Sequence, residues 1–311
     1  AWVYDLFENR SAGPQVFHTF AVVVFVNCLF VGAAGTADCL SRERREGTLG
    51  LLFLTNLNSV EIVAGKVFSN GLALFYSLLA LFPILALPVL IGGITFGEFW
   101  RTVLALLAAL FFAMAAGFSA SSVCVRQFPA IALATGMTLA WALGLVALAE
   151  ALRRRGFSRV SSQQVAMFSP LQTLLSAAES ARGLRLSQYW LSLAAVFGLA
   201  LVSLALTAWR SARSWRDRPK PERWWRRLAF HHNWRERSRA ARTALRARLL
   251  GINPFFWLAS RQRVSAPVFL LLTLLLVLVT VGLTGPYFSK KFPAGTISPL
   301  VGHLFAWFWT G

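Results

Sequence analysis

The sequence predicts an all-α protein, a polytopic bundle of transmembrane helices with about six complete spans, one truncated span and a short helical segment on the cytoplasmic side. Hydrophobic residues make up 57% of the 311 residues and charged residues only 14%, and the mean hydropathy is +0.59. Apolar runs recur along the chain, and most of them have the roughly 20 residues that a helix needs to cross about 30 Å of hydrocarbon. These runs lack the polar faces at helical spacing that helices of soluble proteins carry.

Six complete apolar runs and one incomplete run mark the expected spans. They cover Phe17–Ala37, Val67–Ile91, Thr102–Val125, Pro129–Ala149, Tyr189–Trp209 and Pro267–Leu283, and the last run begins at Leu300. Pro83 and Pro88 are expected to kink the second span, because proline removes a backbone hydrogen bond. We expect the sequence to be part of a longer chain, since it starts with Ala1 and since the run that ends near Gly311 is too short to cross a membrane.

The distribution of basic residues predicts the orientation, because lysine and arginine are retained on the cytoplasmic side during insertion. Placing Cys39–Lys66, Arg126–Phe128 and Arg210–Arg263 inside accounts for most of the 31 basic residues. The arginines of Arg153–Arg185 then lie outside, against the rule. The opposite choice would expose the far more basic Arg210–Arg263, so we expect the first arrangement.

Much of the +19 net charge lies in one connection, Arg210–Arg248. Tryptophans stand among its arginines at positions Trp215, Trp224, Trp225 and Trp234. This pattern is typical of a segment on an anionic inner leaflet, with indole rings at the headgroup level. We expect anionic lipid as its partner, with a soluble protein partner as the alternative, and no nucleic acid. The basic linker, residues 210–252, then separates a first membrane unit at 1–209 from a further unit at 253–311.

Ionisable groups are missing from the middles of the expected spans, although a membrane enzyme, proton pump or ion-coupled carrier needs them at depth. The charged residues nearest the spans stand at their ends: Asp38, Glu98, Arg101, Arg126 and Glu150. Cys28, Cys39 and Cys124 show no metal-ligand spacing. We therefore expect no catalytic residue, no metal site and no cofactor bound by this chain.

The connection between the first two spans is the most informative segment. It is charged at first and strongly apolar from Leu49 to Leu57. An apolar stretch outside the membrane must be covered by lipid or by another protein. Gly47 and Thr48 are expected to end the charged helix, and Thr48 can cap a short apolar helix that follows. Asn58 and Glu61 form a capping-box pattern, which predicts the start of the next helix.

The same connection carries the residues of a family pattern: an acidic-basic-acidic run, Gly-Thr-Leu, an apolar stretch and Glu-Ile-x-x-Gly-Lys. The matching residues are Arg42, Glu43, Arg44, Arg45, Glu46, Gly47, Thr48, Leu49, Leu51, Leu52, Glu61, Ile62, Gly65 and Lys66. This pattern resembles the type-2 ABC exporter permeases. Ser169-Pro170 and the group Trp215, Asp217 and Arg218 also look like the family, so the resemblance covers roughly Pro14 to Pro221. Two departures are Asn56, where the family commonly has proline, and a further membrane helix that we expect upstream of Ala1.

The resemblance implies a mechanical role for the connection. Its proposed coupling residues are Arg42, Glu43, Arg44, Arg45, Glu46, Gly47, Thr48, Leu49, Leu51, Leu52 and Glu61. They would contact a separate ABC ATPase subunit and pass its motion to the membrane helices. ATP and magnesium would belong to that partner, because Gly65-Lys66 is followed by Val67 and lacks the glycine spacing of a phosphate-binding loop.

A second unit is indicated by Asn253-Pro254 with Arg261 and Arg263, which resembles the entry to another permease unit. We expect such a unit to be joined by fusion or by dimerisation. The expected function is the permease of an ATP-driven exporter in the cytoplasmic (inner) membrane, with no indication of the substrate. A membrane-embedded scaffold or assembly protein and a membrane enzyme are the alternatives.

Overall fold

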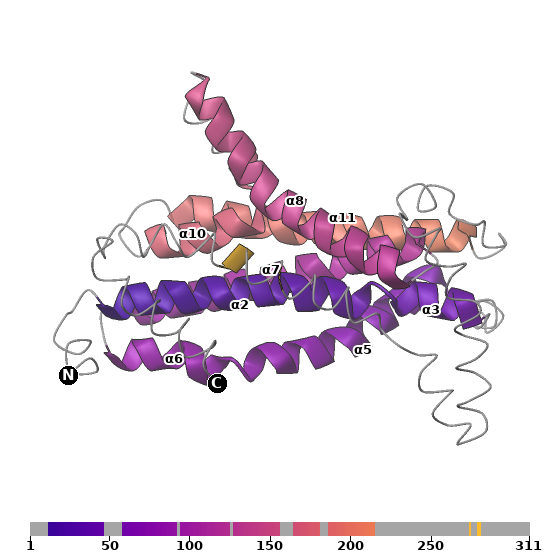
Figure 1. Ribbon diagram of the computed structural model, residues 1–311, viewed down its shortest axis with the longest axis horizontal. Helices are drawn as coiled ribbons and strands as arrows, with labels where there is room; N and C mark the ends of the chain where they lie inside the picture. Colours follow the sequence, from indigo (N-terminus) through magenta and orange to yellow (C-terminus); the bar gives the residue numbers. More distant parts are fainter. Residues whose placement is uncertain are drawn as a thin grey trace, which may run out of the picture.

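The computed structural model describes residues 12–46, 58–91, 94–124, 127–155, 164–180 and 186–214, together with 274 and 279–280. Its helices are α2 (Ala12–Thr36), α3 (Cys39–Glu46), α5 (Ser59–Leu79), α6 (Phe82–Ile91), α7 (Phe96–Val123), α8 (Gln127–Arg154), α10 (Pro170–Ser180) and α11 (Leu186–Ser214). Helices α2, α7 and α11 run along the long axis of one bundle, whereas α8 crosses it obliquely and projects from it at one end, and α3 lies at one end of the bundle (Figure 1). The described residues contain no strand.

Among the described residues, five helical segments are long and apolar enough to cross a membrane, which confirms the predicted fold class. They correspond to the first five expected spans. The expected spans Pro267–Leu283 and the run from Leu300 fall largely outside the described residues, as do residues 215–252 of the basic linker.

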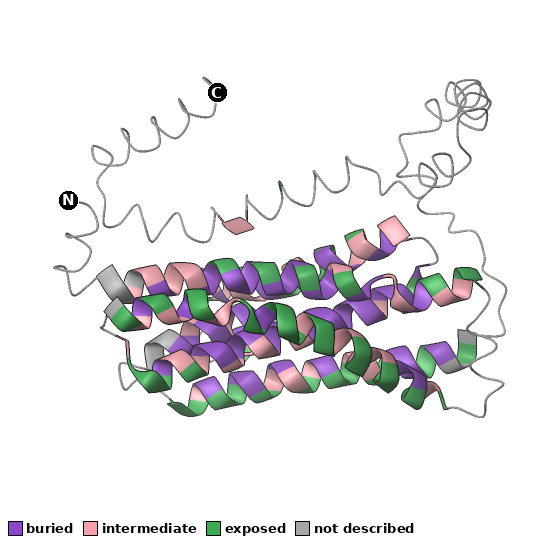
Figure 2. Ribbon diagram, turned by 90° about the horizontal axis from the view of Figure 1, so that it is seen from below, coloured by how far each residue is buried: buried purple, intermediate pink, exposed green. Residues whose placement is uncertain are grey.

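Helix α7 occupies the centre of the bundle. Helices α2, α8, α10 and α11 all pack against it, and most of its residues are buried (Figure 2). Small side chains recur along it at Ala105, Ala108, Ala109, Ala113, Ala116 and Gly117. Small residues let helix backbones approach closely, and this packing drives helix association in lipid, where apolar burial contributes little. The alanine-rich sequence therefore explains why α7 is the covered helix.

The contact between α2 and α7 is tightest at two glycines. A methyl group placed on Gly117 would lie 2.0 Å from the hydroxyl oxygen of Thr36, and one on Gly32 would lie 2.8 Å from the methyl group of Ala113. The Thr36 hydroxyl oxygen lies 2.8 Å from the Gly32 carbonyl oxygen and 3.1 Å from that of Met114 in α7. Only hydrogen fits on the α-carbons of these two glycines.

The second span, in which Pro83 and Pro88 predict a kink, is divided between two helices. Helix α5 ends at Leu79 and α6 begins at Phe82. Pro83 lies in the first turn of α6, where backbone N–H groups have no partner within the helix, so its missing N–H costs no intrahelical hydrogen bond. Pro88 lies inside α6 and does not end it.

Helix α10 was not predicted from the sequence. Its 11 residues are too few to cross a membrane. The hydroxyl of Ser169, just before the helix, donates to the carbonyl of Ala142 in α8 at 2.7 Å, and the indole N–H of Trp141 donates to the carbonyl of Phe168 at 3.1 Å. Ser169-Pro170, which looks like a family feature, thus joins α10 to the middle of α8.

Candidate functional site

The charged segment predicted to be functional forms α3, which continues α2 with only a turn between them. The amide of Ala37 bonds to the carbonyl of Ala33 at 3.0 Å, and the amide of Arg42 bonds to that of Asp38 at 2.9 Å. These bonds close the last turn of α2 and the first turn of α3, and only Ala37 and Asp38 lie between the two helices. Helix α3 is therefore joined to the first described span by a two-residue turn.

Ser121, near the end of α7, holds the start of α3. Its hydroxyl oxygen accepts hydrogen bonds from the backbone N–H groups of Leu40 and Ser41, both at 2.9 Å. The first N–H groups of a helix have no partner within the helix and need such an acceptor. The guanidinium of Arg44 also donates to the Ser122 carbonyl at 3.3 Å. Helix α3, which we call the stem of the connection, is therefore fixed to α7 by backbone and side-chain hydrogen bonds.

One ion pair connects α3 with α5. Lys66 of α5 donates to the carboxylate of Glu43 of α3, and both side chains are largely covered. Glu43 and Lys66 stand on either side of residues 47–57 in the sequence. Their contact holds together the two ends of that connection.

The remaining charges of α3 divide between an inner and an outer set. Arg45 forms two parallel hydrogen bonds with Asp38, at 2.8 and 2.7 Å, a geometry that strengthens the pair. Arg42 pairs with Glu46 at 2.9 Å, and their side chains are 70% and 51% exposed. Exposed pairs of this kind contribute little to stability. Arg42 and Glu46 thus present charge outward.

The predicted capping box at the start of α5 is confirmed. The carboxylate of Glu61 accepts a hydrogen bond from the backbone N–H of Asn58 at 2.9 Å, and α5 begins at Ser59. Glu61, proposed as a coupling residue, therefore also completes the capping box of α5, whose N-cap is Asn58. The other proposed coupling residues Gly47, Thr48, Leu49, Leu51 and Leu52 lie outside the described residues.

Sequence reasoning missed Ser121 and Ser122 as partners of α3. The available signal was the cluster Ser119-Ala120-Ser121-Ser122 at the end of an otherwise apolar run. Hydroxyls at such a position commonly bond across helices. Which helix they bond could not be read from one sequence.

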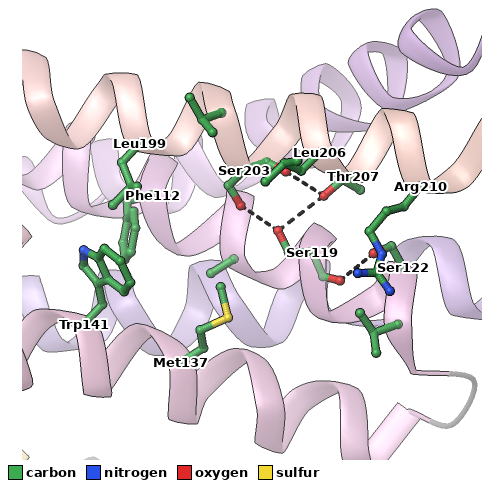
Figure 3. A pocket seen from close by; sticks show the side chains of 13 residues that line it. Phe112, Ser119, Ser122, Met137, Trp141, Leu199, Ser203, Leu206, Thr207 and Arg210 are labelled. Carbon is green, nitrogen blue, oxygen red and sulfur yellow. Dashed lines mark hydrogen bonds between the residues drawn. The ribbon is translucent and has the colours of Figure 1, made fainter.

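A second feature is a cavity of about 260 Å³ between α7, α8 and α11. Its lining is mainly apolar, with hydroxyl groups on one side and Arg210 at one end (Figure 3). Ser119 of α7 lies 2.6 Å from the hydroxyl oxygen of Ser203 and 3.3 Å from that of Thr207, both in α11. These hydroxyls are therefore hydrogen-bonding partners of one another.

At the opposite end of the bundle, His18 of α2 lies 3.4 Å from Glu98 of α7, and the Glu98 side chain is 8% exposed. The described residues contain no group of three or more histidine, cysteine or acidic side chains that could hold a metal ion.

These observations define a class: a multi-pass helical membrane protein whose first described span continues into a charged stem fixed to the central helix. The family model described as "ABC-2 family transporter protein" matches residues 3–209, well over half of the chain, and the chain belongs to this family. The resemblance inferred from the connection is therefore confirmed. No curated protein and no solved structure matches the chain. The chain is thus a membrane permease of an ABC exporter, and permeases of this family normally work with an ATPase subunit.

Proposed function

We propose that this chain exports its substrate across the cytoplasmic membrane, and that α3 passes the motion of a separate ATPase subunit to the membrane helices. The observation that supports this most directly is the ion pair between Glu43 and Lys66. It holds together the two ends of the connection that resembles the family's coupling segment. A force on that connection acts at once on α2, which continues into α3, and on α5.

Helix α7 receives the same motion through Ser121, whose hydroxyl binds two amides of α3. Because α7 lies at the centre of the bundle, a displacement at this end is transmitted to the helices packed around it. The stem α3 is therefore bonded to α5 and α7 and continuous with α2.

The two faces of α3 have different roles in this proposal. Arg42 and Glu46, which face outward, contact the ATPase together with the apolar residues Leu49, Leu51 and Leu52 of the connection. An apolar centre with a charged rim is the usual layout of a docking surface. Glu43, Arg44 and Arg45 keep the stem in place.

The remaining partners follow from the family and from charge. ATP and magnesium bind the ATPase subunit. A second permease unit completes the transporter, by fusion through residues 253–311 or by dimerisation. The basic linker at residues 210–252 binds anionic lipid of the inner leaflet.

Charge reversal across the ion pair tests the transmission. Glu43→Lys and Lys66→Glu each place like charges together, whereas the double variant restores an attractive pair. The readouts are the amount of ATPase that copurifies with the tagged chain from membranes and its rate of ATP hydrolysis. We expect each single variant to retain the ATPase but change the rate severalfold, and the double variant to recover it.

Docking is tested separately by Glu46→Arg combined with Leu51→Ala and Leu52→Ala, which leaves the pair of Glu43 and Lys66 intact. This variant should lose the ATPase while the chain stays at its normal level. Normal hydrolysis rates in both single charge reversals would contradict transmission through α3. A wild-type chain that copurifies with no ATPase would favour the scaffold alternative.

A further inference from the structure

The cavity between α7, α8 and α11 has one charged group, and that group has no partner in the described part of the chain. Arg210 extends from α11 toward Ser122 of α7 (Figure 3). No hydrogen bond or ion pair joins it to any described residue. A guanidinium at the end of an apolar cavity attracts an anionic group, preferably a phosphate, to which it can donate two parallel hydrogen bonds.

The position of Arg210 along α11 places this charge at a membrane edge. The residues of α11 from Ser187 to Trp209 include no charged side chain, and Arg210 is the first charge after them. Trp209 directly precedes it, and tryptophan is enriched at the headgroup level of membranes. The guanidinium therefore lies where the headgroups of lipids lie.

The length of the cavity matches one leaflet. Leu199 and Arg210 both line it from α11, and their separation along the helix corresponds to about 16 Å at the rise of 1.5 Å per residue. Half of a hydrocarbon core of about 30 Å has nearly the same thickness. The cavity runs from the headgroup level at Arg210 to the middle of the bilayer near Leu199.

The walls suit an acyl chain. The three hydroxyls of Ser119, Ser203 and Thr207 bond one another and need no partner from a ligand. The other lining groups away from Arg210 are predominantly apolar. A soluble anion would find only one charged partner, whereas a lipid fills the apolar length as well.

The cavity is also open to the bilayer. Met137 and Trp141 on the α8 wall and Val202 and Leu206 on the α11 wall are exposed on the bundle surface. Helices α8 and α11 each pack on α7 but not closely on each other, so the groove opens between them. A lipid can enter sideways without leaving the membrane.

We propose that this groove is a binding site for one anionic phospholipid, with its headgroup phosphate at Arg210 and an acyl chain along α7 between α8 and α11. The site deepens the proposed binding of anionic lipid by the basic linker, because Arg210 is the first residue of that linker, and it adds an apolar groove formed by residues outside the linker. It depends only on the chain lying in a membrane, not on coupling to an ATPase. Its headgroup end adjoins Ser122, whose carbonyl binds Arg44 of α3.

The test measures lipid retained by the full chain after extraction from vesicles of equal parts phosphatidylglycerol and phosphatidylcholine, counted by native mass spectrometry. The wild type should retain phosphatidylglycerol in preference. Arg210→Gln should lower that retention roughly tenfold, because it removes a charge-assisted hydrogen bond. Arg213→Gln is the matched control: Arg213 is exposed, as Arg210 is, but it stacks on Trp209 and does not line the cavity. It should retain lipid normally.

A second pair of variants tests the apolar part. Val202→Trp adds bulk to the α11 wall, whereas Leu201→Trp introduces the same side chain at a neighbouring position outside the lining; the native side chains are 56% and 58% exposed. Only Val202→Trp should lower retention of phosphatidylglycerol, and excess inorganic phosphate should displace none of it. This pair keeps the test valid if Arg210→Gln does not fold.

Four results would overturn the proposal. The first is equal retention of the two lipids by the wild type, and the second is the same loss in Arg210→Gln and Arg213→Gln. The third is a wild-type chain that retains no lipid, which would assign the groove to a protein segment or to a second copy. Displacement by inorganic phosphate would likewise replace the lipid with a soluble anion.

Discussion

The span formed by α5 and α6 and the span formed by α7 are about equally apolar but have opposite surroundings. In the most apolar stretch of α7, 78% of the residues are buried within the chain, compared with 17% in the stretch that includes α5 and α6. Helix α5 presents large exposed side chains, among them Phe68, Phe75 and Tyr76. Helix α7 has alanine and glycine at its contacts.

Apolarity therefore decides which segments enter the membrane, and side-chain size decides which of them pack together. Lipid tails are as apolar as leucine, so an apolar residue gains little by moving from lipid into a protein core. Close approach of backbones gains dispersion contacts and interhelical hydrogen bonds. The helix with small residues becomes the centre, and α5 leaves its bulky face for lipid or for another protein.

Among variants that test this contrast, we expect the largest loss of stability from Gly117→Ala in α7. The added methyl group would lie 2.0 Å from the Thr36 hydroxyl oxygen and 2.7 Å from the Ala33 carbonyl oxygen, so α2 must move away. Overpacking of this kind costs about 1–3 kcal/mol or more. The measurement is the thermal midpoint and the monodisperse yield of the purified chain.

Gly65→Ala in α5 is the matched control, because nothing lies within 4 Å of a methyl group placed there. It should leave the midpoint unchanged or raise it slightly, since alanine is the better helix former. Equal losses in the two variants would show that glycine flexibility matters here and close packing does not.

A smaller effect is expected from Ser121→Ala. It removes the acceptor of the Leu40 and Ser41 amides and leaves both without it, at a cost of about 1–2 kcal/mol. Hydrogen exchange at these two amides should accelerate about tenfold. Ser77→Ala in α5 is the control, because its hydroxyl bonds only the Ala73 carbonyl of its own helix and lies exposed. Unchanged exchange in Ser121→Ala would show that α3 is held by its side chains alone.

The sequence was sufficient for the spans and for the capping box at Asn58 and Glu61, because run length and cap pattern are local properties. It missed the start of α7 by six residues: the helix begins at Phe96, where Thr95 caps it by accepting from the Glu98 amide at 3.2 Å. The charged residues before Thr102 concealed that start. Apolar runs mark the membrane core, whereas helices extend beyond it.

The partners within the candidate site could not be predicted in the same way. The pairing of Glu43 with Lys66 and of Ser121 with α3 depends on which helices are neighbours. A single sequence contains the residues but no measure of their proximity. Helix α10 escaped prediction for a related reason, because its hold on α8 comes from Ser169 and Trp141, which bond distant backbone carbonyls.

The smallest effect on stability is expected from variants on the two faces of α3. One face of this short helix is covered and the other is exposed, as α7 is covered and α5 is exposed in the bundle. Arg45→Gln removes two parallel hydrogen bonds to Asp38 in a partly covered pair, and we expect a loss of about 1 kcal/mol in stability. Arg42→Gln removes an exposed pair with Glu46, and the thermal midpoint should not change. Both variants lose the same charge within one turn of the helix, so each controls for the other.

The two faces also differ in their proposed partners. If Arg42 contacts the ATPase, as proposed, Arg42→Gln should reduce ATPase copurification while the chain remains as stable as the wild type. A lower midpoint in Arg42→Gln than in Arg45→Gln would reverse the assignment, because it would place the structural contact on the outer face of α3 and leave the inner face for the partner.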